Sequence, residues 1–92
     1  MRLSYDERQR LKWRREDLKS RRQYLFDQKN RLQAQIQDQY SILNSGARLS
    51  RYDRDAIKNT IQGLKYSKED FQRSINDINQ ELNEINRQLH GN

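Results

Sequence analysis

The segment RQRLKWRREDLKSRRQYLF, residues 8–26, holds eight basic residues, two acidic residues and the chain's single tryptophan. Arginine side chains bind phosphate and carboxylate groups through paired N–H donors, and an aromatic side chain among them can anchor a partner. The composition of this segment therefore indicates a surface for an anionic partner, either nucleic acid or an acidic protein.

The spacing within the segment favours a different interpretation. Leu11, Leu18 and Leu25 recur every seven residues, as in a coiled coil. On a helical wheel the basic residues form two rows beside this leucine stripe, where side-chain stems cover the seam and charged ends meet a neighbouring helix. We therefore favour cations that are solvated or paired within the chain, with an acidic protein partner and nucleic acid as the alternatives.

Two sets of candidate binding residues follow from this pattern. Trp13 and Tyr24 lie opposite the leucines on the wheel, where an exposed tryptophan is an expected interface anchor. The protein-binding set joins these aromatic residues to their neighbouring arginines: Trp13, Tyr24, Arg14, Arg15, Arg21 and Arg22. The alternative, nucleic-acid-binding set contains the basic residues of both rows: Arg8, Arg10, Lys12, Arg14, Arg15, Lys19, Arg21 and Arg22.

The residues that enzymes need are scarce. His90 is the only histidine and stands near the end of the sequence, and there is no cysteine to act as a nucleophile or thiolate ligand. The carboxylate pairs at 16–17 and 69–70 belong to polar helical segments, without a pocket that would shift a pKa. No glycine-rich phosphate loop occurs. We expect no enzymatic activity, no metal and no cofactor.

Composition sets the size and class of the protein. The chain has 92 residues, of which 32% are hydrophobic and 35% charged, with no proline and three glycines. One domain is the most this length allows, and little interrupts a helix. No apolar run approaches the roughly 20 residues of a membrane span, and residues 1–10 lack the apolar part of a secretory signal. We expect a soluble, cytoplasmic protein that does not enter membranes.

The second half of the chain carries the clearer helical pattern. Apolar residues alternate at four- and three-residue spacing over more than four heptads, which is typical of a coiled coil, and only Lys68 interrupts them. The last five are assigned to the seam or to an oligomer interface: Ile75, Ile78, Leu82, Ile85 and Leu89. In the first half a second apolar column begins only after Leu32, with Ile36, Tyr40 and Leu43.

Capping patterns locate the ends of the helices. Ser4 and Ser50 are each followed three residues later by an acidic residue, as in a capping box, and Gly46 can end the first helix. We predict an all-α fold with helices at about 5–44 and 51–90 and a turn at about 45–50, so that residues 1–92 form one antiparallel coiled-coil hairpin. The alternative is one continuous helix in a parallel dimer, which would run through Gly46 and lose both caps.

This hairpin looks incompletely covered. The apolar stripe at 75–89 faces mainly the single leucine column of the first helix. We expect a second hairpin or a partner helix to cover it, forming a helical bundle; the alternative is that arginine and lysine stems suffice. The predicted function is a non-enzymatic protein-interaction module, such as an adaptor, a scaffold or an inhibitor-like subunit of a larger assembly.

Overall fold

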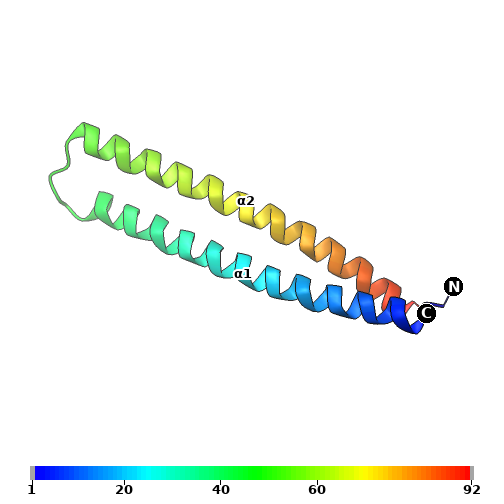
Figure 1. Cartoon of the computed structure of the whole chain (residues 1–92). Coiled ribbons are helices and arrows are strands. Elements are labelled where there is room, and N and C mark those ends of the chain that lie inside the picture. The colour runs from blue at the N-terminus through cyan, green and yellow to red at the C-terminus, as the bar shows by residue number, and fades with distance from the viewer. Residues whose placement is uncertain (1, 92) are drawn as a thin grey trace.

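A computed structural model describes residues 2–91 as a hairpin of two long helices (Figure 1). Helix α1 runs from Tyr5 to Asn44 and helix α2 from Arg51 to His90, and residues 45–50 connect them. The helices lie side by side in opposite directions, so that both termini are at one end of a body of 67 × 15 × 14 Å. The predicted antiparallel helical hairpin and its helix boundaries are confirmed.

The caps explain why the helices begin and end at these residues. At the start of α1, the Ser4 hydroxyl accepts a hydrogen bond from the Glu7 backbone N–H at 3.1 Å. At the start of α2 the capping box is complete, because Ser50 accepts from the Asp53 N–H at 3.0 Å and the Asp53 carboxylate accepts from the Ser50 N–H at 3.4 Å. Gly46 follows α1 with a φ of +76°, a backbone conformation that side-chain-bearing residues rarely adopt.

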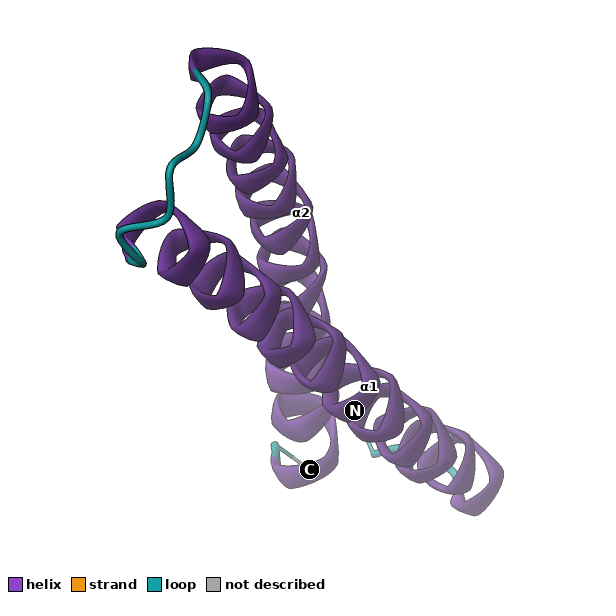
Figure 2. Ribbon diagram, turned by 90° about the vertical axis from the view of Figure 1, so that its left-hand side faces the viewer, coloured by secondary structure: helices purple, strands orange, loops and turns teal. Residues whose placement is uncertain are grey.

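The seam between the helices contains the hydrophobic core. In Figure 2 the two helices cross at an angle, which is how a heptad stripe keeps facing its partner helix. Every predicted seam position of α2 is buried or half-buried. The core is densest near the termini, where Leu18 of α1 packs among Leu82, Ile85 and Leu89 of α2.

The first helix departs from prediction near the turn. Tyr40 was expected in the seam, but 39% of its surface is exposed, while Gln39 is half-buried. The Tyr40 hydroxyl accepts a hydrogen bond from Lys65 Nζ at 2.8 Å. A phenol retains its hydrogen bond most easily at the edge of a core, and this tyrosine therefore lies beside the seam.

Candidate binding surface

One row of basic residues on α1 reaches across the seam to polar groups on α2. Arg15 donates to Asn86 Oδ1 at 3.4 Å and Arg22 to Asn79 Oδ1 at 2.8 Å, and Lys29 donates to Gln72. Each step of seven residues along α1 is matched by a step of seven in the reverse direction along α2. These cations therefore occupy the inner positions that an apolar second column would otherwise fill.

The apolar stripe on α2 is covered by the leucines of α1, with the half-buried cations of this row beside them. Arg15, Arg22 and Lys29 are themselves half-buried, which places their methylene groups against the seam. Within the single chain, Ile75, Leu82, Ile85 and Leu89 are buried and Ile78 is half-buried. Four of the five stripe residues are therefore buried by the hairpin itself, in line with the second of the two alternatives above.

Arg8 extends the same row to the end of the hairpin. Its guanidinium donates a hydrogen bond to the Leu89 carbonyl oxygen at 3.3 Å, across a sequence separation of 81 residues. The last carbonyl groups of a helix lack partners within the helix, and a cation there also interacts favourably with the helix dipole. Arg8 thus fastens the C-terminus of α2 to the start of α1.

The second row is more exposed and includes a paired contact. Arg14 makes two hydrogen bonds to the Glu81 carboxylate, at 3.0 Å from Nε and 3.3 Å from the second terminal nitrogen. These bonds and the charge of Glu81 raise the pKa of the Arg14 guanidinium above its ordinary value. Arg21 Nε lies 3.1 Å from Asp17 Oδ2 on the same helix. Pairs this exposed contribute little to stability.

Pairing does not cancel the positive charge of α1. Arg22 donates to the neutral amide of Asn79, which leaves its charge without a carboxylate partner within residues 2–91. Arg15 donates to the Asn86 amide, and its Nε, which is buried without a hydrogen-bond partner, lies 3.9 Å from Glu16 Oε1. Lys19 lies 3.5 Å from Glu16. Arg10 and Lys12 make no hydrogen bond or ion pair with other residues in the described range 2–91. The candidate nucleic-acid set therefore divides into members that join the two helices, members paired on the surface and members without a polar partner in that range.

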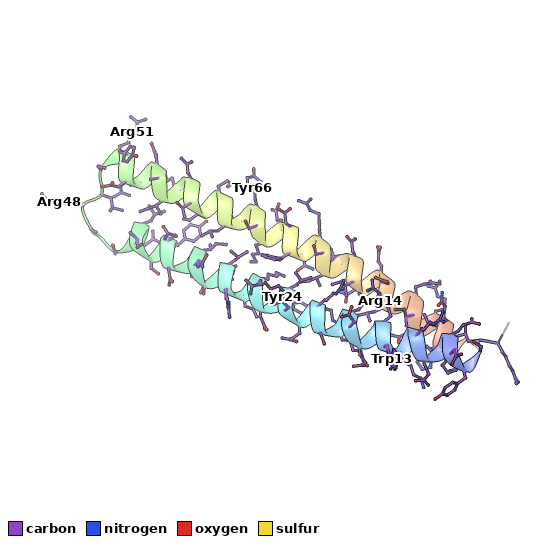
Figure 3. All side chains as sticks on the ribbon, in the orientation of Figure 1. Trp13, Arg14, Tyr24, Arg48, Arg51 and Tyr66 are labelled. Carbon is purple, nitrogen blue, oxygen red and sulfur yellow. The ribbon has the colours of Figure 1, made fainter. Side chains whose placement is uncertain are left out.

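The candidate aromatic residues lie on the outer face of α1. Trp13 is 74% exposed and Tyr24 is 61% exposed. In Figure 3 Trp13 projects from the side of α1 that faces away from α2, whereas Arg14 points toward α2. The two rings are eleven residues apart, close to three helical turns, and share one side of the helix about 16 Å apart along its axis.

Sequence reasoning missed several exposed residues elsewhere. Tyr52 and Tyr66 of α2 are strongly exposed, and Tyr66 points away from α1 in Figure 3. Arg48 and Arg51 project from the turn end of the hairpin. The protein also has a hollow between the helices whose lining includes Lys29, Lys65 and Lys68. Only Lys68 had given a signal in the sequence, as the one interruption of the heptads.

The described residues contain no group of histidine, cysteine and carboxylate side chains arranged to hold a metal ion. Helices α1 and α2 likewise lack, within residues 2–91, any segment that is apolar over a length sufficient to cross a bilayer. The chain matches no protein-family model, no curated protein and no solved structure at a significant level.

Proposed function

We propose that the chain is a non-enzymatic, cytoplasmic interaction module that binds an acidic helical protein surface through the outer face of α1. The proposal rests on Trp13, the single tryptophan, whose large apolar side chain is 74% exposed on the outer face of α1. Tryptophan and arginine are the residue types that most often dominate binding energy at protein interfaces. An adaptor, scaffold or inhibitor-like subunit of a larger assembly would use such a face.

The neighbours of Trp13 favour an acidic partner. Arg14 and Arg21 lie between Trp13 and Tyr24 along the helix axis, on the flank of α1 nearer α2, and are seven residues apart. A partner helix with carboxylates at heptad spacing could meet both arginines. Their present partners, Glu81 and Asp17, are exposed carboxylates that can be exchanged for those of another protein at little cost. Solvated Arg10 adds to the positive field of the same side.

Site-specific photo-crosslinking tests this assignment. A photoreactive phenylalanine analogue replaces Trp13 or Tyr24, and in matched control proteins it replaces Tyr52 or Tyr66, which are also exposed aromatic residues but lie on α2. We expect crosslinks to one protein from positions 13 and 24 and not from 52 or 66. Equal crosslinking from all four positions, or crosslinking from positions 52 and 66 alone, would show that the outer face of α1 is not the binding site.

The captured protein then permits a quantitative test. Truncating a central tryptophan commonly costs about 2 kcal/mol or more, so Trp13→Ala should weaken binding by roughly tenfold or more. Tyr66→Ala should leave the affinity unchanged. Far-UV circular dichroism of both variants should match the parent protein, because neither ring contributes to the seam. An unchanged affinity for Trp13→Ala would contradict the proposal.

Nucleic-acid binding through the basic rows is the second candidate. It is favoured by Arg22, whose guanidinium donates to the Asn79 amide and has no carboxylate partner within residues 2–91. Fluorescence anisotropy with mixed-sequence DNA and RNA over a salt titration would detect it. Sub-micromolar binding that persists at about 150 mM salt, with a steep slope of log affinity against log salt concentration, would support nucleic-acid binding as the function. Binding that vanishes at about 150 mM salt would be a non-specific polyelectrolyte effect.

A further inference from the structure

A hollow of about 350 Å³ lies in the middle of the hairpin, away from Trp13 and Tyr24. Its lining comprises three lysines, one glutamate and one glutamine: Lys29, Lys65, Lys68, Glu69 and Gln72. Lys29 belongs to α1 and the other four to α2, so the hollow lies between the helices. Its volume is at the lower end of the range for small-molecule sites.

Two of these lysines are held in the seam by amide groups. Lys29 donates to the side-chain oxygen of Gln72, and Lys68 donates to that of Gln33 on the opposite helix. Both lysines are half-buried. An ammonium group has three N–H donors, and each of these contacts uses one of them. Donors therefore remain on two ammonium groups whose positions are fixed by the opposite helix.

The third lysine is positioned by Tyr40. The Lys65 ammonium donates to the Tyr40 hydroxyl at 2.8 Å and lies 5.3 Å from the centre of the Tyr40 ring. Lys65 and Lys68 are three residues apart on α2, which places their side chains on one side of the helix. Three lysines from two helices thus line one hollow.

The charge of the hollow is not balanced. None of the three lysines forms an ion pair with a carboxylate within residues 2–91, and Glu69 is the one acid in the lining. Three lysines against one glutamate give a formal charge of +2. Like charges brought together in a half-buried site repel one another, and a dianion in the hollow would relieve this repulsion and accept the remaining ammonium donors.

We propose that this lysine hollow binds a phosphate group. The phosphate dianion matches the lining in charge, and its oxygens accept hydrogen bonds from several ammonium groups at once, as lysine commonly provides at phosphate sites. The phosphate could be free or part of a nucleic-acid backbone, and the same lysines would recognise either source. The site is independent of the outer face of α1.

NMR titration of the intact chain with pyrophosphate tests the proposal directly. The side-chain amide signals of Gln33 and Gln72 report on the hollow because both glutamines accept from its lysines. We expect saturable shifts confined to these signals and to neighbouring backbone amides, against sodium chloride at matched ionic strength. Shifts that do not saturate, or that chloride reproduces, would overturn the site.

Three variants separate binding from folding. Lys65→Gln removes a cation that lies outside the seam, so the fold should persist while the affinity for pyrophosphate falls several-fold. Lys68→Leu restores an apolar seam position, so the protein should become more stable and lose affinity at the same time. Lys58→Gln is the matched control, since Lys58 is exposed on α2 and outside the hollow, and its affinity should equal that of the parent protein.

The same titration with a short single-stranded RNA identifies the source of the phosphate. Pyrophosphate binding that the RNA does not reproduce indicates a free ligand, and RNA-induced shifts at Gln33 and Gln72 indicate a backbone phosphate. Loss of affinity that is equal for Lys58→Gln and Lys65→Gln would show general charge attraction and refute a defined site. None of these results depends on the Trp13 variants, so the two proposals fail separately.

Discussion

At the scale of single residues, Leu18 shows how a thin hairpin obtains a core. It is 1% exposed although α1 offers no second apolar column beside it. Arg15 and Arg22, one turn to either side, reach across to Asn86 and Asn79 and lay their stems along the seam. Long cationic side chains thus do part of the covering for which a coiled coil normally uses leucine or isoleucine.

This view predicts a large effect of truncating Leu18. Leu18→Ala should reduce the free energy of unfolding by about 2–5 kcal/mol, because it leaves a void between two helices that cannot collapse onto it fully. Chemical denaturation followed by circular dichroism measures the loss. Ile42→Ala is the control, since Ile42 is an apolar residue of the same helix exposed to 42%, and its cost should stay within about 0.5 kcal/mol. An equal loss of unfolding free energy for Leu18→Ala and Ile42→Ala would show that Leu18 is not a core residue.

At the scale of the helix, Gly63 makes α2 less stable than an alanine at the same position would. It lies in the helix interior, and a Cβ added there would meet nothing within 4 Å. Gly63→Ala should therefore raise the stability by about 0.5–1 kcal/mol, through lower backbone entropy of the unfolded chain. A shift of the urea midpoint at constant slope would measure it.

Gly46 supplies the matched comparison for that variant. It too has open space around it, but its φ is +76°, so Gly46→Ala should destabilise the hairpin by about 1 kcal/mol. The same substitution is thus expected to have opposite signs at two positions. Destabilisation by Gly63→Ala would show that α2 needs glycine at 63 for a bend or for the approach of another molecule.

Element boundaries were the most predictable part of this fold. Ser50 and Asp53 form their capping box from local contacts alone, and the heptads of α2 are visible because each seam position is a separate apolar residue. The inner row of α1 was not predictable in the same way. Whether Arg22 turns toward Asn79 or toward solvent depends on the register of the two helices and on rotamers that the residue type does not determine. The extent to which α1 buries the α2 stripe could therefore not be read from the sequence.

The lysine hollow was hidden for a related reason. Lys68 was recognisable as a break in the heptads, but the sequence pattern did not link it to Lys29 or to Lys65. Their convergence requires that residue 29 lie opposite residue 72, which is set by the antiparallel register of the whole hairpin. The outward positions of Trp13 and Tyr24, by contrast, depend only on helical periodicity, which is why the wheel located them correctly.

At the scale of the whole molecule, a single chain supplies both sides of its own core. The stripe at 75–89 is buried within the hairpin, so folding should not require a second copy. The thermal midpoint of a protein that folds alone is independent of its concentration, whereas that of a protein that folds only as a dimer rises with concentration. We expect an unchanged midpoint over a hundredfold range, and small-angle scattering should give a length near 67 Å. A single helix through Gly46 would be about 140 Å long at ~1.5 Å per residue. A scattering length near that value, together with a midpoint that rises with concentration, would show that the chain forms a parallel dimer of continuous helices and not a hairpin.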